Sequence, residues 1–152
     1  MSRSEGEDPI AIATRVFDTL RTEFPALAMK SGTPIHSVDF AFSIPRQPGL
    51  VFDVEMNLQN GDELQMNIDA FWGYWFPCTD PLVERRFLDA VRGLLTGRYR
   101  IAVYSRRGRA YTCLLQAPKG DGWETAYAAR SLHWPCWNPD IRYVQNARAE
   151  QV

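Results

Sequence analysis

The histidines and cysteines of this 152-residue chain are few, and only one pair of them has a spacing that suggests chemistry. His133 and Cys136 are separated by two residues, as zinc ligands often are, and Cys78 or Cys113 could extend such a set. A structural zinc site needs four ligands, usually in two close pairs, and the sequence contains no Cys-x-x-Cys. The sequence therefore predicts no metal and no cofactor.

Catalytic patterns are equally incomplete. The same His133 and Cys136 would form a thiolate pair, but no motif around them indicates an activated nucleophile. Three carboxylates, those of Asp53, Glu55 and Asp69, could act together as acids and bases. They alternate with amide side chains, which is more typical of the solvated face of a sheet. The sequence leans towards a protein that is not an enzyme, and a small enzyme stays open as an alternative.

Aromatic side chains form the most conspicuous feature of the sequence. They cluster in two segments, and the candidate binding residues in them are Phe71, Trp72, Tyr74, Trp75 and Phe76, followed later by His133, Trp134 and Trp137. Both segments contain the pattern aromatic-Pro-Cys-x-Asx-Pro, which predicts two helix starts. Trp and Tyr also supply large contact areas at little cost in entropy. The two segments are therefore candidates for a partner-binding surface or for the walls of a small-molecule pocket.

Arginine dominates the basic side chains, with fifteen Arg against two Lys. Eight of the fifteen lie between residues 85 and 109, and three of them, Arg106, Arg107 and Arg109, stand at the tip of a predicted hairpin. Such a tip could contact anions, and nucleic acid is one alternative. Alternatively, Arg98 and Arg100 pair with carboxylates across the sheet. We favour this second interpretation because nucleic-acid-binding domains are usually basic overall, whereas this chain has a net charge of −1.

The formal net charge of −1 hides an uneven distribution. Residues 1–84 carry 5 basic and 13 acidic side chains, a net charge of −8, and residues 85–152 carry 12 basic and 5 acidic ones, a net charge of +7. The two parts either neutralise each other or form separate poles that attract partners.

Three Asx-Pro pairs predict where helices begin, because the Asx side chain caps the helix and proline fits its first position. The first helix begins after Asp8-Pro9 and ends before Pro25, and the second begins after Asp80-Pro81 and ends at Gly97. Apolar residues recur every three or four positions in both. The third pair, Asn138-Pro139, predicts a short last helix.

Alternation of apolar and polar residues predicts six strands. They span residues 38–44, 50–58, 64–70, 99–103, 111–115 and 123–127. The register of two hairpins follows from the requirement that the apolar side chains of both strands point to the same face. A slip of one residue would turn all side chains of a strand to the opposite face. A three-residue loop at 59–61 pairs Met56 with Leu64, and a bulged turn that ends at Gly108 pairs Val103 with Tyr111.

These elements predict an α+β fold, an antiparallel sheet with helices packed on one face, in the order α-β-β-β-α-β-β-β-α. The length predicts a single domain over residues 1–152, frayed at 1–7 and 147–152. The longest apolar stretch, residues 71–78, is too short to span a membrane. The polar N-terminus shows no export signal, so we expect a cytoplasmic protein with reduced thiols.

The order of elements is similar to that of the small α+β chaperones of type III secretion and of related bacterial regulator-like domains. That resemblance implies dimers and exposed apolar grooves that hold segments of partner proteins. We therefore expect a non-catalytic protein-binding module, a homodimer, that acts through its aromatic segments. A small-molecule-binding domain or a nucleic-acid-binding protein are the alternatives.

Overall fold

The computed structural model describes residues 6–32, 38–130 and 138–147. Its elements are α1 (Pro9–Glu23), β1 (Lys30–Gly32), β2 (Val38–Ile44), β3 (Val54–Gln59), β4 (Glu63–Ile68), β5 (Phe71–Trp75), α2 (Pro81–Leu95), β6 (Arg100–Arg106), β7 (Arg109–Lys119), β8 (Gly122–Arg130) and β9 (Asp140–Val144). Two antiparallel sheets and two helices make this an α+β fold, which confirms the predicted class.

The two helices begin where the sequence predicts. The side chains of Asp8 and Asp80 accept hydrogen bonds from the backbone N–H groups of Ile10 (3.2 Å) and Leu82 (2.9 Å). Gly97 follows α2 with φ +74°, the left-handed conformation expected of a residue that ends a helix. Within the described ranges, neither helix is long and apolar enough to cross a membrane.

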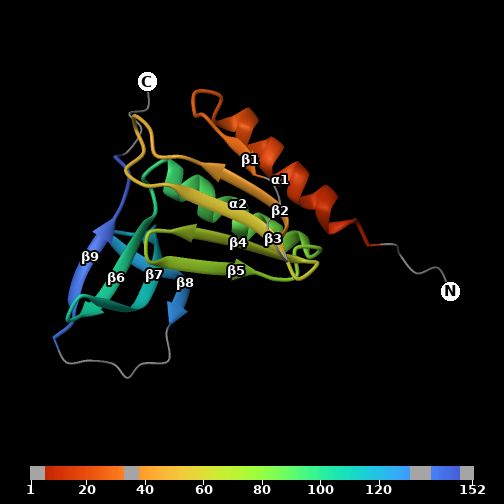
Figure 1. The fold of residues 1–152 in the computed structure, drawn as a ribbon. Coiled ribbons are helices and arrows are strands. Elements are labelled where there is room, and N and C mark those ends of the chain that lie inside the picture. Colours follow the sequence, from red (N-terminus) through yellow and green to blue (C-terminus); the bar gives the residue numbers. More distant parts are fainter. Residues whose placement is uncertain (1–5, 33–37, 131–137, 148–152) are drawn as a thin grey trace.

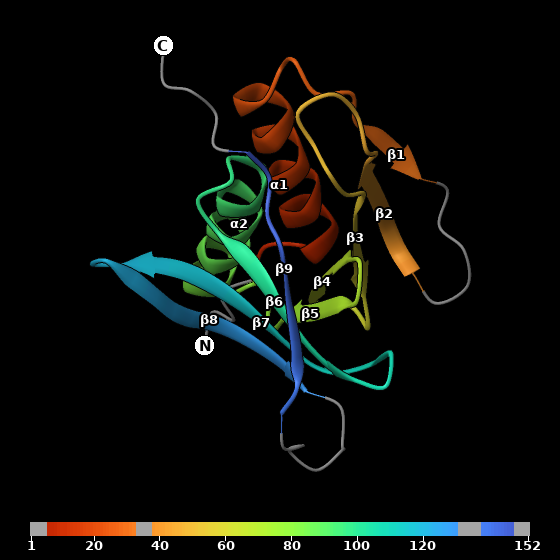
Figure 2. The ribbon, with the colours of Figure 1, turned by 90° about the vertical axis from the view of Figure 1, so that its left-hand side faces the viewer.

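The first sheet has the strand order β1-β2-β3-β4-β5. Its inner face is apolar along every long strand, and α1 and α2 cover that face (Figure 2). Phe17 of α1 stacks on Phe42 of β2 with ring centroids 4.4 Å apart. The opposite face carries polar side chains such as Glu55 and Asn67. The sequence did not predict β1, which is very short, or β5, which lies in the aromatic segment.

The second sheet has the strand order β8-β7-β6-β9 and lies across one end of the first sheet, beside β5 (Figure 1). Its inner face, which includes Ile101, Val103 and Leu115, belongs to the same apolar core as the first sheet and the helices. The fold therefore has two sheets that share one core, where the sequence predicted a single sheet.

The predicted last helix is wrong, because residues 140–144 form strand β9. This strand pairs with β6, for example Ile141 with Tyr104 and Tyr143 with Ala102. Asn138 has φ +53°, so the Asx-Pro pair begins a turn here rather than a helix. Pairing with a strand about 40 residues earlier outweighs the local helix signal.

The first hairpin keeps the predicted parity but not the predicted register. Its loop has three residues, Asn60 to Asp62, and Met56 pairs with Met66 instead of Leu64. Asn60 (φ +52°) and Gly61 (φ +85°) both adopt the left-handed conformation. The shift of two residues leaves every side chain on its predicted face and moves the three-residue loop by one position, from 59–61 to 60–62.

The β6–β7 hairpin also differs from its predicted register. Its turn has only two residues, Arg107 (φ +51°) and Gly108 (φ +76°), and Val103 pairs with Cys113 instead of Tyr111. Two left-handed central residues are the mark of a tight hairpin turn whose twist matches that of the strands. A bulge at Tyr104/Ser105 shifts the register by one residue and so restores the apolar face.

The segment after β9 is fastened to the rest of the fold by Asn146, which is buried. Its amide nitrogen donates to the carbonyl oxygen of Leu94 at the end of α2 (3.0 Å), and its amide oxygen accepts from the backbone N–H of Val51 (2.8 Å). This one side chain joins three parts of the chain that are far apart in sequence. Residues 148–152, part of the end predicted to fray, lie outside the described residues.

Candidate functional site

Strand β5 divides the aromatic segment between two faces. Phe71 and Trp75 point into the core and are buried, whereas Trp72 (56% exposed) and Tyr74 (52%) lie on the open side, and Phe76 (61%) follows the strand. The alternation is that of an ordinary strand, in which successive side chains point to opposite faces. The five candidate residues therefore do not form one contact surface. Two of them belong to the core, and three are accessible.

Tyr127 of β8 joins the second sheet to β5. Its ring centroid lies 4.8 Å from that of Trp75 and 5.7 Å from that of Phe71, and its hydroxyl oxygen accepts a hydrogen bond from the backbone N–H of Tyr74 (3.1 Å). Burial raises the pKa of the Tyr127 hydroxyl. The phenol therefore stays neutral at physiological pH and acts as a fixed structural link.

A hollow of about 540 Å³ lies between β5 and the strands β7 and β8. We call it the aromatic groove. Its lining combines aromatic and small side chains, and the residues that line it are Ala70, Trp72, Tyr74, Ala110, Tyr111, Thr112, Cys113, Tyr127, Ala128 and Ala129. Two candidate binding residues from the sequence, Trp72 and Tyr74, therefore meet a second set of residues that the sequence did not indicate as binding residues.

The bulge in the β6–β7 hairpin contributes to this groove. It shifts the register across Tyr111, and bulges of this kind redirect a side chain relative to a regular strand. Tyr111 and Tyr127 alternate with small residues in the sequence, a signal that could have marked them as parts of one lined surface.

A hydrogen-bond chain on the open face of the first sheet holds Trp72 in place. The indole N–H of Trp72 donates to the amide oxygen of Gln65 (3.1 Å), and the amide nitrogen of Gln65 donates to a carboxylate oxygen of Glu63 (2.9 Å). Gln65 is only 3% exposed, so it has little freedom to change its orientation. The groove wall that Trp72 forms is thus preorganised.

The described cysteines have the properties of buried structural thiols. Burial raises the pKa of Cys78 to about 11 and also raises the pKa of Cys113, whose Sγ donates to the carbonyl oxygen of Ala70 (3.4 Å). Thiols of this kind are poor nucleophiles at neutral pH. In residues 6–32, 38–130 and 138–147, no three His, Cys, Asp or Glu side chains converge as metal ligands would.

The second aromatic segment falls on residues that the structure does not describe. These are His133, Trp134 and Trp137, together with Cys136. The first copy of the repeated motif does begin a helix, since Asp80 caps α2 and Cys78 is buried just before it. The second copy leads into β9 instead.

The three carboxylates considered as acids and bases have separate surroundings. A carboxylate oxygen of Asp53 accepts from the backbone N–H of Arg46 (2.6 Å), and Asp69 forms an ion pair with Arg142 of β9 (2.5 Å). Glu55 is exposed on the open sheet face. Two of the three therefore have clear structural partners.

The acidic and basic parts of the chain neutralise each other only locally. Arg142 with Asp69 and Arg92 with Glu23 (2.5 Å) link the two parts. The expected pairing of Arg98 and Arg100 with Asp53, Glu55 or Asp69 across one sheet is wrong. Strand β6, which begins at Arg100, belongs to the other sheet, and neither arginine forms an ion pair with a described residue. Arg100 instead lies between the rings of Trp123 and Tyr143, at 4.1 and 3.9 Å from their centroids. Arg100 therefore does not neutralise a carboxylate of the first sheet.

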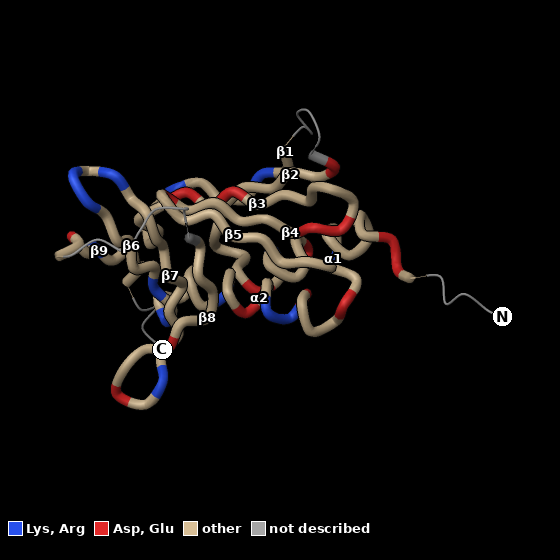
Figure 3. Tube along the Cα trace, turned by 90° about the horizontal axis from the view of Figure 1, so that it is seen from below, with Lys and Arg blue, Asp and Glu red and all other residues tan. Residues whose placement is uncertain are grey.

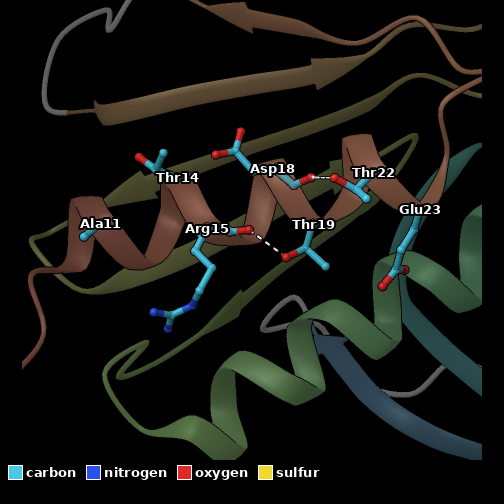
Figure 4. Close-up of a pocket in the computed structure, with 7 residues that line it drawn as sticks. All are labelled: Ala11, Thr14, Arg15, Asp18, Thr19, Thr22 and Glu23. Atoms are coloured by element: carbon cyan, nitrogen blue, oxygen red, sulfur yellow. Dashed lines mark hydrogen bonds between the residues drawn. The ribbon is translucent and has the colours of Figure 1, made fainter.

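In two other pockets, polar groups that could bind a ligand already bind one another. One, of about 620 Å³, follows the outer side of α1, where the hydroxyls of Thr19 and Thr22 donate to the carbonyl oxygens of Arg15 (2.8 Å) and Asp18 (2.9 Å) of the same helix (Figure 4). The other, of about 430 Å³, lies between the ends of α1 and α2 around the Arg92–Glu23 ion pair.

The chain was compared with models of protein families, with curated proteins and with solved structures, and none of the three comparisons found a match.

Proposed function

We propose that this protein is a non-catalytic binding module that holds an extended segment of a partner protein in the aromatic groove. The observation that carries the proposal is the groove itself, in which Trp72 and Tyr74 of β5 face small side chains of β7 and β8. Rigid aromatic walls favour binding because they bury a large area without losing much side-chain entropy.

The shape of the groove supports an extended peptide. It is partly open to solvent and is lined by residues of three strands, so a chain can enter it without threading into a closed cavity. Small residues such as Ala110, Ala128 and Ala129 leave room for apolar side chains that point down from the bound segment. This is the arrangement by which grooves select apolar residues at intervals along a peptide.

The chemistry of the groove supports binding over catalysis. The pKa values of Cys113 and Tyr127 are raised, so both groups are neutral at physiological pH, and each is already engaged in a hydrogen bond. Binding without reaction needs only a preorganised surface, and the hydrogen bond from Trp72 to Gln65 supports one.

The test is selection of displayed random peptides on the whole protein. We expect enrichment of sequences with apolar residues at alternating positions, and loss of their binding in Ala128→Trp, which fills the groove. Thr125→Trp is the matched control, because Thr125 is an exposed residue of the same strand outside the groove. Trp75 is left unchanged because it belongs to the core.

Three results would count against the proposal. One is the absence of enriched peptides, and another is equal binding to both variants. The third is a small apolar molecule, retained by the purified protein and displaced by Ala128→Trp, which would favour a small-molecule site. Light scattering of the protein alone tests self-association as a further use of the same surface, and it should show a lower mass in Ala128→Trp if a second copy occupies the groove.

A further inference from the structure

The tip of the β6–β7 hairpin carries three exposed arginines, Arg106, Arg107 and Arg109 (Figure 3). Arg109 directly precedes Ala110, a residue of the groove, so the two Cα atoms are about 3.8 Å apart. The basic tip therefore lies at one end of the aromatic groove.

The hairpin tip is built at a cost to its own stability. Arg106 pairs directly with Arg109 across the two strands, and like charges in that position destabilise a hairpin. Arg107 has φ +51°, a conformation in which Gly, Asn or Asp is the usual residue. Neither choice helps the hairpin to fold, which suggests that the charges serve another purpose.

These three arginines lie near one acidic residue, because Asp140 of β9 pairs with Ser105, which directly precedes Arg106. Arg15, Arg92 and Arg142 form ion pairs with carboxylates, but Arg106, Arg107 and Arg109 form none within the described part of the chain. Three arginines beside a single aspartate leave the tip with a net positive charge, which attracts an anionic partner and raises its rate of association.

We propose that the segment held in the aromatic groove has acidic residues at the end that meets the β6–β7 hairpin. This inference rests on the proposed function, and it adds the charge and the direction of the bound segment. Cys113, which lines the groove, is four positions from Arg109, which is about 13 Å along a strand. The acidic and apolar residues of the bound segment are therefore about four positions apart.

The charge distribution favours a peptide over a nucleic acid. A surface for single-stranded nucleic acid carries basic side chains along its whole length, so that they follow the phosphates. Here the basic side chains gather at one end, and the lining of the groove beyond them is uncharged. Asp69, beside the groove residue Ala70, is neutralised by Arg142. An apolar segment with one acidic end matches this pattern.

The experiment repeats the peptide selection on two proteins, the native chain and the triple variant Arg106→Glu, Arg107→Glu, Arg109→Glu. All three residues are exposed, so circular dichroism should show an unchanged fold. Peptides selected on the native protein should carry Asp or Glu about four positions from their apolar residues and should bind the triple variant on the order of tenfold more weakly. Peptides selected on the triple variant should carry Lys or Arg at the same positions. Lys119→Glu, at the tip of the β7–β8 hairpin, is the control. Peptides selected on this variant should have the same acidic residues as those selected on the native protein.

The possible results separate this inference from the proposed function. If both proteins select the same apolar peptides without a charge preference, the inference is overturned and the groove remains a peptide site. If acidic peptides bind through the arginines but ignore Ala128→Trp, the groove is not the site and both proposals fail. Salt-dependent binding of a random single-stranded DNA pool, lost in the triple variant and without selection of acidic peptides, would assign the tip to nucleic acid.

Discussion

The hydroxyl oxygen of Tyr127 accepts a hydrogen bond from the backbone N–H of Tyr74, and this 3.1 Å contact ties the edge of the first sheet to the second. Both residues also line the aromatic groove. The stability of the fold and the shape of the groove therefore depend on the same bond.

Tyr127→Phe should lower the free energy of unfolding by about 1 kcal/mol, because it keeps the ring contacts but leaves the N–H of Tyr74 without its acceptor. In a chain of this size that corresponds to a fall in melting temperature of about 2–4 °C. Thermal unfolding followed by circular dichroism measures it. Tyr143→Phe, at an exposed ring of β9, is the control, and an equal effect in both variants would contradict the role of the bond.

Asn146→Ala should be more damaging, with a loss of about 2–4 kcal/mol, because it removes two buried hydrogen bonds at once. Asn146→Asp keeps an acceptor for Val51 but sets an oxygen against the carbonyl of Leu94, so it should not restore stability. Urea unfolding of the two variants tests this. Asn67→Ala, on the open sheet face, should change stability by less than about 0.5 kcal/mol.

Replacing Arg107 can separate backbone strain from charge. Arg107→Asn and Arg107→Gln remove the same charge, but only Asn favours the left-handed conformation seen at this position (φ +51°). We expect Arg107→Asn to be more stable than Arg107→Gln by about 0.5–1 kcal/mol. Equal stability would mean that the turn relaxes in solution, and the argument from strain would then be withdrawn.

Stability should depend on pH through Glu23. The hydrogen bond from Arg92 lowers the pKa of the Glu23 carboxyl below its ordinary value of about 4.3. A lowered pKa in the folded state stabilises the fold above the unfolded value, and the contribution is lost as the pH falls through the folded value.

Glu23→Gln should therefore cost up to about 1 kcal/mol at neutral pH, and the difference from the native protein should vanish in strong acid. Urea unfolding at a series of pH values measures it. Glu55→Gln is the control, since Glu55 forms no ion pair with any described residue. A difference that persists at low pH would show that packing, not charge, accounts for the effect.

The two described thiols should react slowly in the folded protein. With Cys136 changed to Ser, Cys78 and Cys113 should react with a disulfide reagent at mildly alkaline pH at least about tenfold more slowly than in the denatured chain, because burial raises both pKa values. Absorbance of the released thiol follows the reaction. Rapid modification of Cys113 in the folded state would show that the floor of the groove opens, and it would revive a reactive role.

Local signals in the sequence predicted local structure well. Asp8 and Asp80 cap their helices as expected, and parity placed Met56 and Met66 on the inner face even though their partners were misassigned. Each of these features depends on residues that are close in the sequence, so the local pattern of polar and apolar residues is sufficient to predict it.

The predictions that were wrong or incomplete concern contacts between residues that are far apart in the sequence. Ile141 and Tyr143 alternate with polar residues as a strand does, but the nearby Asn138-Pro139 suggested a helix, and only β6 decides between the two. The groove likewise needs Trp72 and Tyr127, which belong to different sheets. The sequence predicted Trp72 as a binding residue, but it could not predict that Tyr127 lies beside it in the groove.

Strand β9 has a further consequence for how the chain is made. It is the partner of β6, and it comes after β7 and β8 in the chain. During translation, the N–H and C=O groups on the outer edge of β6 therefore stay open while the ribosome adds everything from β7 up to β9. Open edges are where nascent chains pair with one another. The risk of aggregation at this edge thus lasts from the synthesis of β6 to that of β9, and a ribosome that pauses in this interval would prolong the exposure of the unpaired edge.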